Sequence, residues 1–495
     1  MISILAQIRL WAAQTPTYPA LESTQIQLSY AELQRRIDIL SQLLRRARPR
    51  HIGILLGNSP DWVVIQLAAF AGGIPVTPIP TFFSPKQQRH ALNQSGVTLL
   101  FCDQPDYAAE LDPDFRPDPA LHPLALSRDI APVTLPEGTL LVTFTSGSTG
   151  TPKGVCLDGA LLSRVCRALF QRVGHAGVER HACLLPLAVL LENLAGVFLP
   201  FYAGGCCLLA SDQETGLQGS SGLDLPQFAN FLHQHQPESL ILTPELLKAL
   251  LHLHRSGLNC DQFKLLAVGG ARVPLQLLQQ AQQLGLPVIE GYGLSECGSV
   301  VALNALDQPG AGCGQPLEHC QIEIASDGEI LVRGPAMLGY VGEEPLPAYS
   351  LVHTGDLGYL DSHGNLHVQG RTKNLFINSF GRNFSPEWIE AEFSALPEIR
   401  QFCLFGDHQP FNTAVLLPMP GVSEHTLELA INRLNTSLPD YARVSRWIIA
   451  EQPFSASNEQ LTANGRIRRQ AIADQYRWAL DSIYPTTQEQ PHAVL

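Results

Sequence analysis

A chain of 495 residues is too long for a single hydrophobic core, so we expect two or three domains. Apolar residues make up 45% of the chain and charged residues 16%, which is typical of a globular protein and excludes a disordered one. The formal net charge of −13 argues against a nucleic-acid-binding surface, although an anionic small ligand needs only local cations.

The N-terminal segment, residues 1–11, is apolar but short and carries Arg9, so we expect a helix rather than a signal peptide. No apolar run approaches the roughly 18 residues of a membrane span, so any membrane contact is expected to be peripheral. The eleven cysteines are scattered, odd in number and without C-x-x-C spacing. These features predict a reduced, cytoplasmic protein without structural zinc.

Between residues 25 and 80, helical patterns alternate with short apolar runs. We expect helices at 30–44 and 61–72, a strand at 51–56, and a strand and turn at 74–80. Alternating strands and helices predict a parallel sheet covered by helices. Residues 103–135 contain many prolines and aspartates and few periodic apolar residues, so we expect a surface connection there.

The next stretch, residues 139–154, is typical of a phosphate-binding loop. An apolar run at 140–144 predicts a buried strand, and a second run at 155–157 predicts another. Glycine lets the backbone approach a ligand closely, hydroxyl and N–H groups donate hydrogen bonds, and a lysine adds a mobile charge. The residues predicted to bind phosphates are Thr145, Ser146, Gly147, Ser148, Thr149, Gly150 and Lys153.

A Walker A loop is the main alternative for this stretch. That motif needs a lysine followed by serine or threonine, and a helix behind it. Here Pro152 precedes the lysine, Gly154 follows it, and an apolar run continues the chain. A flexible surface turn, the other alternative, would need neither Lys153 nor a strand on each side. The pattern therefore favours a phosphate loop between two strands.

Residues 184–196 form an apolar stretch with one carboxylate, Glu192, and residues 211–224 are expected to be a polar loop. Strand-like runs follow at 240–242 and 265–268, the second leading to Gly270 and Ala271. His233 and His235 are spaced i, i+2, which places them on different sides of a helix. We therefore expect surface histidines rather than metal ligands.

Tyr292 stands between two glycines, which leaves its ring face open for a planar base to stack. Ser295 and Glu296 add a hydroxyl and a carboxylate. A carboxylate near a triphosphate is repulsive unless a divalent cation bridges them, so Glu296 predicts a Mg²⁺ ligand. Taken alone, the segment is also compatible with a strand-to-helix turn in which Glu296 is a cap.

Asp356 follows a glycine and is suited either to form a turn or to accept hydrogen bonds from a ribose diol. Arg371 lies 15 residues further on and adds a cation that can contact the sugar.

Together, these motifs resemble those of the acyl-adenylate-forming enzymes: acyl-CoA synthetases, luciferases and peptide-synthetase adenylation domains. The resemblance also includes residues 312–316 and 328–340, and it extends from residue 140 to about residue 470. It implies an α/β fold with a large N-terminal AMP-binding lobe of helix-covered sheets (1–370) and a hinge (371–373). A small, mobile α+β C-terminal domain (374–485) and a frayed tail (486–495) follow.

The resemblance also implies roles for individual residues. The adenine is expected near Gly270, Ala271, Tyr292 and Gly293, and the ribose on Asp356 and Arg371. The expected hinge residue is Lys373, and Gly381 is expected in the thiol tunnel. Ser295 replaces the family's usual threonine and keeps its hydroxyl. The expected catalytic residues are Ser295, Glu296 and Arg466.

Residues 185–193 and 374–390 are similar to long-chain fatty acyl-CoA synthetases, with Val189 and Asn193 replacing the usual histidine and arginine. An apolar lining suits an apolar acyl tail, at roughly 0.8 kcal/mol per buried methylene. The predicted acyl pocket comprises Leu187, Val189, Leu190 and Glu192. Ordinary core packing explains any single one of these residues equally well.

One departure from the family concerns its catalytic lysine. The family pattern is Asn-Gly-Lys-x-x-Arg; here Arg466 occupies the lysine position, Arg469 matches the trailing arginine, and residues 374–495 contain no lysine. Arginine keeps the charge but is a broad planar group. Loss of one well-placed donor typically costs ~10²–10³ in rate. The chain has 27 arginines and 5 lysines, which favours a tolerated replacement, yet Lys153 and Lys373 are kept.

The sequence therefore predicts an acid–thiol ligase. ATP with Mg²⁺ activates an apolar, fatty carboxylic acid as acyl-AMP, and the thiol of CoA or of carrier-protein phosphopantetheine accepts the acyl group. One alternative is an adenylate-forming enzyme with a non-thiol acceptor or only one half-reaction. The other is a degenerate protein that binds a nucleotide or acyl-adenylate without making one.

Overall fold

The structure is a computed structural model that describes residues 3–145, 152–218, 222–306, 312–347, 349–377, 383–462 and 465–484. It divides into two compact units. The large unit comprises residues 1–271, 280–354 and 359–367, and the small unit comprises residues 272–279, 355–358 and 368–495.

Within its described part, the large unit contains a sheet in the order β18-β17-β16-β15-β14-β10-β11-β1-β2. The strands from β16 to β1 are parallel, and β17, β18 and β2 are antiparallel additions at the edges. The strand bounds are β1 (Pro19–Glu22), β2 (Gln27–Ser29), β10 (Arg180–Cys183), β11 (Cys206–Leu209), β14 (Ser239–Leu242), β15 (Leu265–Val268), β16 (Val288–Tyr292), β17 (Ala302–Leu303) and β18 (Gln315–Pro316).

A second sheet of the large unit has the order β21-β9-β8-β4-β3-β5-β7-β6, with β8, β4, β3 and β5 parallel. Its strands are β3 (Ile52–Leu55), β4 (Val76–Pro78), β5 (Leu99–Cys102), β6 (Arg116–Pro117), β7 (Ala125–Ser127), β8 (Thr139–Thr145), β9 (Lys153–Asp158) and β21 (Gly339–Tyr340). A smaller sheet contains β19 (Gln321–Ile324), β20 (Glu329–Arg333), β22 (Val352–Leu360) and β23 (Leu366–Arg371), and β12 (Leu217–Gln218) pairs with β13 (Gly222–Leu223).

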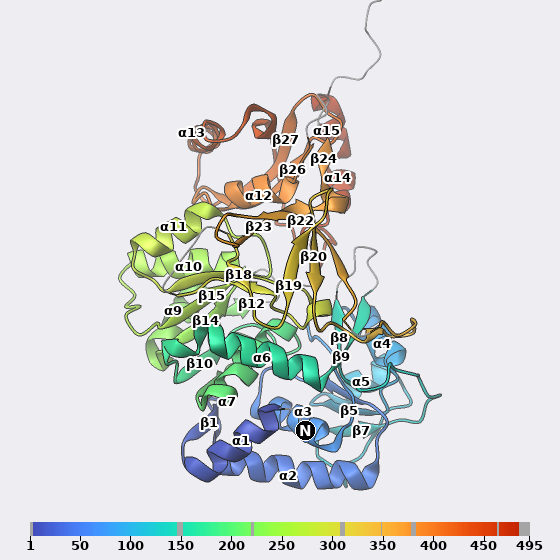
Figure 1. Cartoon of the computed structure of the whole chain (residues 1–495). Helices are drawn as coiled ribbons and strands as arrows, with labels where there is room; N and C mark the ends of the chain where they lie inside the picture. The colour runs from blue at the N-terminus through green and yellow to red at the C-terminus, as the bar shows by residue number, and fades with distance from the viewer. Residues whose placement is uncertain are drawn as a thin grey trace, which may run out of the picture. The chain divides into compact units, whose positions relative to one another are not determined.

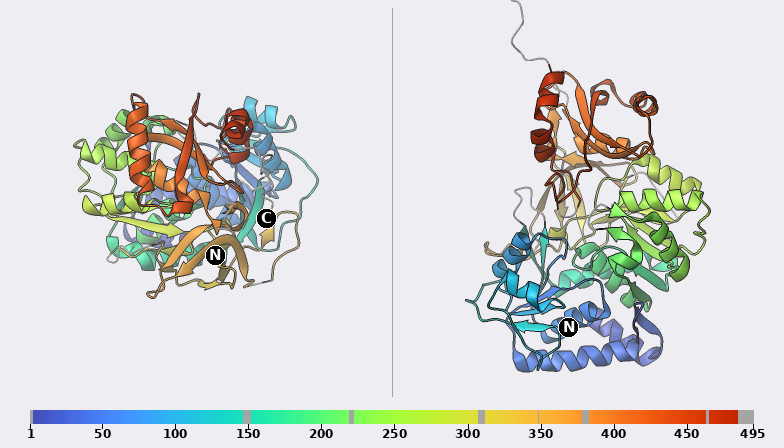
Figure 2. Two further views of the ribbon diagram at one scale, coloured as in Figure 1. Left: turned by 90° about the horizontal axis from the view of Figure 1, so that it is seen from above. Right: turned by 180° about the vertical axis from the view of Figure 1, so that it is seen from behind.

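Helices cover these sheets (Figures 1 and 2). The helices in this part of the chain are α1 (Ser3–Gln14), α2 (Tyr30–Ala47), α3 (Pro60–Gly72), α4 (Pro85–Gln94), α5 (Pro105–Leu111), α6 (Gly159–Val173), α7 (Leu199–Ala203), α8 (Asp212–Thr215), α9 (Leu225–His235), α10 (Pro244–Arg255) and α11 (Leu275–Gln283). Shorter turns are η1 (Gly174–Ala176), the π-helical η2 (Glu192–Phe198) and η3 (Ser295–Cys297). Helix α10 packs against β14, and η2 packs against β10 and β14.

The predicted helices and strands of the N-terminal region are confirmed, and local sequence explains their ends. Helix α2 begins with a capping box in which Ser29 and Glu32 bond each other's backbone N–H, and it ends before Arg48 in the left-handed region. Helix α3 starts at Pro60 behind the Ser59 cap and ends before Gly73 at φ +68°. The predicted N-terminal helix is α1.

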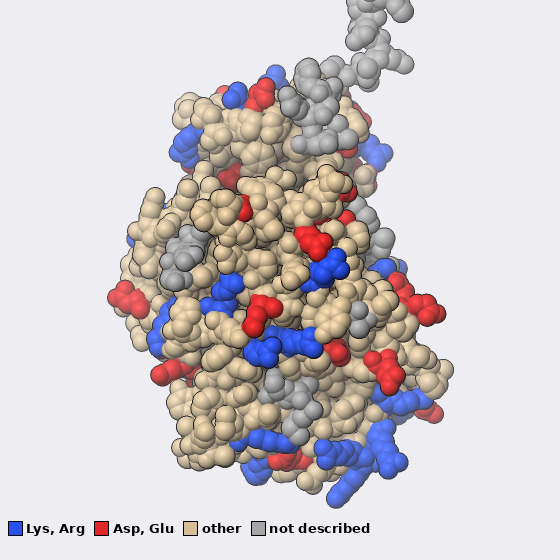
Figure 3. Space-filling view, in the orientation of Figure 1, with Lys and Arg blue, Asp and Glu red and all other residues tan. Residues whose placement is uncertain are grey.

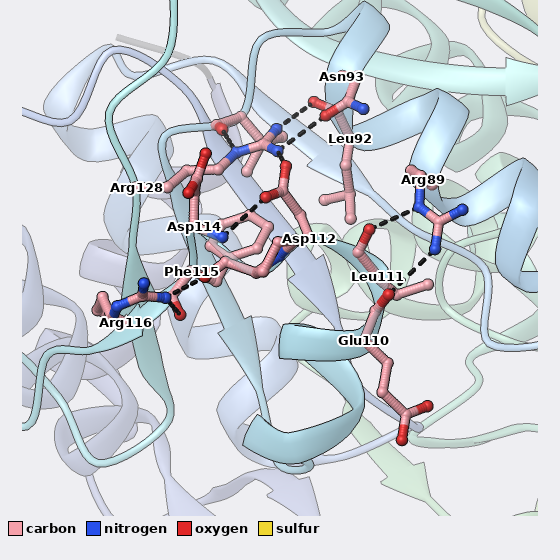
Figure 4. A network of polar contacts seen from close by, with 12 residues as sticks. Arg89, Leu92, Asn93, Glu110, Leu111, Asp112, Asp114, Phe115, Arg116 and Arg128 are labelled. Carbon is pink, nitrogen blue, oxygen red and sulfur yellow. Dashed lines mark hydrogen bonds and ion pairs between the residues drawn. The ribbon is translucent and has the colours of Figure 1, made fainter.

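The expectation of a plain surface connection at residues 103–135 is wrong. This segment forms α5, β6 and β7, and β7 extends the second sheet by pairing with β5. The cause is Arg128, whose side chain is fully buried and paired with Asp112 (Figure 4). Its guanidinium also donates to the carbonyls of Val97 and Leu92 at 2.8 and 2.9 Å. One buried arginine therefore ties the segment to the sheet.

The small unit contains the sheet β26 (Ile399–Phe405), β27 (Asn412–Pro418) and β28 (Val444–Ile449) and the hairpin β24 (Phe376–Ile377) with β25 (Asn383–Phe384). Its helices include α12 (Pro386–Ser394), α13 (Glu424–Asn435), α14 (Arg469–Gln475) and α15 (Arg477–Ile483), with the turns η4 (Thr372–Asn374) and η5 (Asp440–Ala442). Strand β26 alternates between two cores: Phe402 packs toward α12 and α13, and Cys403 toward α14 and α15. These helices therefore cover opposite faces of the sheet (Figure 2).

Two further findings bear on the expectations from sequence. Across the described ranges, every helix is too short or too polar to cross a bilayer. All eleven cysteines lie in those ranges, are buried and form no disulfide with one another.

Candidate active site

Strands β8 and β9 form the hairpin that carries the predicted phosphate loop. They pair antiparallel, with Thr145 opposite Lys153 at the open end, and their interior is buried. The ring of His90 donates to the carbonyl oxygen of Pro152 at 3.0 Å. The prediction of a strand on each side of the loop is confirmed. The predicted loop residues Ser146, Gly147, Ser148, Thr149 and Gly150 lie outside the described residues.

Strand β21 lies close beside this hairpin because Gly154 has no side chain. A Cβ on Gly154 would lie 2.9 Å from a methyl group of Val341 and 3.0 Å from the ring of Phe144. Strand β21 pairs antiparallel with β9, with Tyr340 opposite Val155. This register brings Tyr340, from a distant part of the sequence, next to Lys153.

Lys153, Tyr340, Glu296 and Glu343 form one polar group, which we call the lysine cluster. The Lys153 ammonium lies 4.8 Å from the centre of the Tyr340 ring and 3.1 Å from a carboxylate oxygen of Glu343. The Tyr340 hydroxyl donates to Oε1 of Glu296 at 2.9 Å. Burial, and then the charge of Glu296, raise the pKa of Tyr340, so its hydroxyl keeps its proton. The structure thus joins the predicted phosphate lysine and the predicted metal ligand through one tyrosine.

Glu296 fits the role of a magnesium ligand. It lies in η3, directly after Ser295, and its backbone carbonyl accepts from the N–H of Met337 at 2.7 Å. Tyr340 fixes one carboxylate oxygen, and no hydrogen bond from the described residues reaches the other. Mg²⁺ is commonly held by one or two carboxylates together with substrate phosphates. The side chain is therefore oriented with one oxygen available.

The residues predicted to surround the adenine lie together at one edge of the first sheet. Strands β15 and β16 are parallel neighbours, with Val268 opposite Glu290, so their carboxyl ends meet. Gly270, at φ +79°, and Ala271 follow the first strand; Tyr292 ends the second. A Cβ on Gly293 would lie 1.5 Å from a backbone oxygen, so only glycine fits there. Ligands of open α/β sheets commonly bind at such edges.

The two predicted ribose residues and one of the three predicted catalytic residues, Arg466, lie together in the small unit, whereas Ser295 and Glu296 belong to the large unit. Asp356 is 5% exposed and pairs with the Nε of Arg371 at 2.9 Å. Arg466 is exposed as a whole residue, yet desolvation and the neighbouring charge of Arg371 lower its pKa, while Asp356 opposes the shift. Gly355, at φ +69°, lies inside strand β22, so residues 354–356 do not form the tight turn that the sequence allowed.

The backbone of Lys373, the predicted hinge residue, lies in η4, and Gly381 lies outside the described residues. The position of Arg469 suggests a structural role for this residue. It pairs with the buried Glu390 at 2.6 Å and donates to the carbonyl of Leu404 at 3.0 Å, so it joins α14 to β26.

The predicted acyl segment contains a second polar group, which we call the buried cluster: His181, Glu192, Asn193 and Gln66. Glu192 is fully buried, and both of its oxygens are engaged, one by His181 at 3.1 Å and one by the backbone N–H of Leu185 at 3.2 Å. Asn193 and Gln66 exchange two hydrogen bonds of 2.9 Å.

The other predicted acyl-pocket residues differ in burial. Leu187 and Leu190 belong to the hydrophobic core, and Val189 is half-buried. The thiol of Cys183 joins His181 and Glu192 to bring three possible metal-ligating atoms within 4.8 Å. These groups already have protein partners, because the second His181 nitrogen contacts the Ser239 hydroxyl at 2.7 Å and the thiol donates to the carbonyl of Gly196. Hydrogen bonding alone therefore accounts for this arrangement.

Sequence reasoning gave no role to Tyr340 and Glu343. Tyr340 ends the segment 328–340, which contributed to the family resemblance, but it lies more than a hundred residues from Lys153 in sequence. Only the pairing of β21 with β9 brings the two together, so the pattern around Lys153 contains no signal for it.

Comparisons with known proteins identify the family of both parts of the chain. Residues 8–341 match the AMP-binding enzyme family, and residues 373–488 match the AMP-binding enzyme C-terminal domain. A 2-succinylbenzoate–CoA ligase of Bacillus anthracis is 26% identical over 420 residues, covering 79% of this chain and 83% of the relative. A putative fatty-acid–CoA ligase of Mycobacterium tuberculosis is 26% identical over 422 residues, covering 70% and 74%.

Solved structures show the same fold. The o-succinylbenzoate CoA synthetase of Bacillus subtilis, in complex with its acyl-adenylate intermediate, superposes with a TM-score of 0.75 at 22% identity, covering 95% of this chain and 98% of the other. Another structure of that protein holds ATP and a magnesium ion.

These matches confirm the predicted α/β fold with a large N-terminal and a smaller C-terminal domain. They support the special likeness to long-chain fatty acyl-CoA synthetases only loosely, because relatives named for an aromatic acid match equally well. Since the family match covers more than half of its length, the chain belongs to the AMP-binding enzymes.

Proposed function

We propose that this protein is an acid–thiol ligase that uses ATP and Mg²⁺ to convert a carboxylic acid into an acyl-adenylate and then transfers the acyl group to CoA. The observation that carries the proposal is the lysine cluster, in which Tyr340 links Lys153 to Glu296. A phosphate-binding cation and a magnesium-type carboxylate held side by side are what a nucleoside triphosphate requires. The names of the relatives, CoA ligases, support the choice of acceptor.

In the first half-reaction, a carboxylate oxygen of the acid attacks the α-phosphorus of ATP, and the bond from that phosphorus to the bridging oxygen breaks to release pyrophosphate. Lys153 neutralises phosphate charge, and Glu296 holds Mg²⁺, which screens the negative charge of the phosphates. Asp356 accepts hydrogen bonds from the ribose, and Arg371 fixes the orientation of that carboxylate at 2.9 Å. Arg466, whose charge interacts with those of Asp356 and Arg371 in the small unit, is proposed to supply positive charge to this step. Positioning and charge neutralisation supply most of such catalysis.

In the second half-reaction, the thiolate sulfur of CoA attacks the acyl carbon and AMP leaves with the bonding electrons. We propose that rotation about the segment 371–373 brings the small unit, including Gly381, to the thiol. Carrier-protein phosphopantetheine offers the same thiol and is the alternative acceptor.

The acid is proposed to have an apolar body. Val189 is half-buried on the segment after β10, and Leu187 and Leu190 beside it are buried among other apolar side chains. Named relatives act on an aromatic acid in one case and a fatty acid in another, so both classes fit this lining. Each buried methylene of the substrate adds roughly 0.8 kcal/mol.

The deciding experiment is ATP–pyrophosphate exchange, screened over fatty acids of increasing chain length and over aromatic acids. We expect exchange with at least one apolar acid. Nucleotide binding without exchange for any acid would instead favour the degenerate binding protein. For an active acid, products formed with CoA, carrier protein and hydroxylamine separate a thiol ligase from an enzyme with another acceptor or only one half-reaction.

The variant Arg466→Lys tests whether this arginine is a tolerated replacement. A compact ammonium concentrates the charge that the guanidinium spreads, and it reduces crowding against Arg371. We expect faster exchange in Arg466→Lys, with Arg468→Lys as the matched control two residues away. An unchanged or slower rate would show that the site is adapted to arginine.

A further inference from the structure

Away from the lysine cluster, the large unit has a hollow of about 520 Å³ between α6 and the segments around β19 and β20. Arg164, Arg167 and Arg333 line it, together with His319 and Tyr349. None of these residues belongs to the candidate active site. A volume of this size is in the range of pockets that bind small organic molecules. It is larger than a single inorganic ion would fill.

Two of the arginines are cations without a carboxylate partner. Arg164 and Arg167 lie one helical turn apart on α6, where like charges repel each other. Arg167 makes no hydrogen bond or ion pair with the described part of the chain, and Arg164 donates to the Tyr349 hydroxyl at 3.0 Å. Figure 3 shows basic side chains across the face that α6 forms in Figure 1. In a chain of net charge −13, such a group favours an anion.

His319 gives a second, independent indication. Both ring nitrogens are shielded from solvent, and neither has a hydrogen-bond partner among the described residues. Burial lowers the pKa of His319 to about 4, so the ring is neutral near pH 7, with one nitrogen as donor and one as acceptor. Buried polar atoms in native proteins are nearly always satisfied, by protein, water or a ligand. His319 lines the hollow, so a polar side chain whose hydrogen bonds the described residues leave unmade lies at its wall.

The backbone around the hollow is also unusual. Tyr349 has φ +60°, a region that costs a bulky residue of order 1–3 kcal/mol, and its side chain is 59% exposed. Its ring lies 5.9 Å from the guanidinium carbon of Arg164. Gly334 has φ +150°, and a Cβ there would lie 2.9 Å from the backbone oxygen of His319. Close packing thus holds His319 at the wall, and Tyr349 offers an open aromatic face.

We propose that this hollow is a second binding site, for a small organic phosphate whose phosphate group is held by Arg164, Arg167 and Arg333 and whose body packs on Tyr349. A terminal phosphate presents three oxygens, enough for three guanidinium groups, whereas a carboxylate presents two. The half-exposed Arg333 is paired with Glu323 at 2.9 Å, and Glu318 also lines the hollow, so the phosphate competes with these two carboxylates.

Phenyl phosphate is a suitable probe, because it has the terminal phosphate and an aromatic body without being a nucleotide. Isothermal titration calorimetry measures its affinity for the full chain, for Arg164→Gln/Arg167→Gln and for the matched double variant Arg46→Gln/Arg255→Gln. The control positions are exposed arginines of the same unit that make no hydrogen bond or ion pair with the described residues. We expect at least about tenfold weaker binding in the first double variant, because charged hydrogen bonds are lost, and no change in the second.

The candidate active site also binds phosphates, so Lys153→Ala separates the two sites. This variant is expected to keep its affinity for phenyl phosphate, and Arg164→Gln/Arg167→Gln is expected to keep ATP–pyrophosphate exchange. Loss of phenyl phosphate binding in Lys153→Ala, unchanged binding in Arg164→Gln/Arg167→Gln, or no binding to the unmodified chain would each overturn the proposal. Inorganic phosphate is the second probe: equal affinity for both would overturn the role of Tyr349 in holding an organic body.

Discussion

The large unit contains two clusters of polar side chains, the buried cluster and the lysine cluster. They differ in how many of their donor and acceptor atoms have a hydrogen-bond partner within the described residues. In the buried cluster, the side chains of Glu192 and His181 are 0% and 4% exposed, and each polar atom of the pair has a protein partner. In the lysine cluster, the side chains of Lys153 and Glu343 are 52% and 54% exposed, and Glu296 keeps one oxygen without a partner from the described residues. A saturated, buried group stabilises a fold, whereas an exposed and incompletely paired group can exchange its partners for a ligand. Complete hydrogen bonding is therefore the property by which we infer a structural role for Glu192, and incomplete hydrogen bonding the property by which we propose a functional role for Glu296.

Replacing Lys153 is the test of this comparison for which we expect the largest change in activity. In Lys153→Ala we expect ATP–pyrophosphate exchange to fall by ~10²–10³, because a charge aimed at the developing phosphate negative charge is lost. The free energy of unfolding is expected to change by less than about 0.5 kcal/mol, since the side chain is half exposed. Lys86→Ala, an exposed lysine on α4, is the control and is expected to change neither. A large loss of stability in Lys153→Ala would show that the lysine cluster is structural.

The buried cluster is expected to respond in the opposite way. Glu192→Ala leaves the ring nitrogen of His181 and the N–H of Leu185 without an acceptor, which costs about 2–3 kcal/mol of unfolding free energy, measured by urea titration. Glu137→Ala, on an exposed loop of the same unit, is the control.

If Glu192 instead contacts the acyl chain, Glu192→Ala will keep its stability and shift the preference among acids in the exchange assay. That result would show that Glu192 contacts the substrate and does not mainly stabilise the fold.

These two groups also show what sequence can and cannot predict here. The β8–β9 hairpin, with Lys153 at its open end, was predictable because the signal is local: apolar runs on both sides of a polar, glycine-rich stretch. The link from Lys153 to Glu296 was not, because it passes through Tyr340, which only the pairing of a short edge strand brings near.

Non-local partners explain the other differences as well. Residues 103–135 looked like a surface connection because their apolar residues are few, but one buried arginine, Arg128, holds the segment in place through contacts with α4 and β5 neighbours. The hydrogen bonds of Glu192, which the sequence predicted in the acyl pocket, were not predictable, because its partners His181 and Leu185 belong to a strand end that the pattern could not pair with it. Local sequence patterns therefore predict helices and strands. The role of a polar side chain depends on hydrogen-bond partners that are distant in the sequence.

His51 is another buried, hydrogen-bonded side chain, and its titration makes the stability of the fold depend on pH. It is 2% exposed, lies 2.7 Å from the Thr77 hydroxyl, and burial lowers its pKa to about 4. Its ordinary pKa in an unfolded chain is about 6.5, so the unfolded state binds the proton more tightly. The stabilisation is present above pH 6.5 and is lost as the pH falls toward 4, about 2 kcal/mol between pH 7 and pH 5. Urea titrations at the two pH values measure it.

The variant His51→Gln isolates this contribution, because a glutamine does not titrate. We expect the difference in unfolding free energy between pH 7 and pH 5 to be smaller in His51→Gln by about 2 kcal/mol. His425→Gln, at an exposed position on α13, is expected to keep the full difference. An unchanged pH dependence in His51→Gln would mean that other groups dominate acid destabilisation.

The smallest expected effect comes from the hydroxyl that joins Lys153 to Glu296. Tyr340→Phe keeps the ring beside the ammonium and removes only the 2.9 Å hydrogen bond to the carboxylate. We expect exchange to fall roughly two- to tenfold, the usual net worth of one hydrogen bond. The Mg²⁺ concentration for half-maximal exchange is expected to rise by a similar factor, because Glu296 loses its fixed orientation.

The metal dependence is the informative measurement, since a purely structural hydroxyl would not move it. Tyr202→Phe is the control, because its ring packs on Phe170 and its hydroxyl has no hydrogen bond from the described chain. If Tyr340→Phe lowers exchange at every Mg²⁺ concentration by the same factor, the hydroxyl acts on the phosphates and not through Glu296. The contacts of Tyr340 with Lys153 and with Glu296 would then be independent of each other. In that case the exposure of Lys153, and not the unpaired oxygen of Glu296, would be the better indication of a functional site.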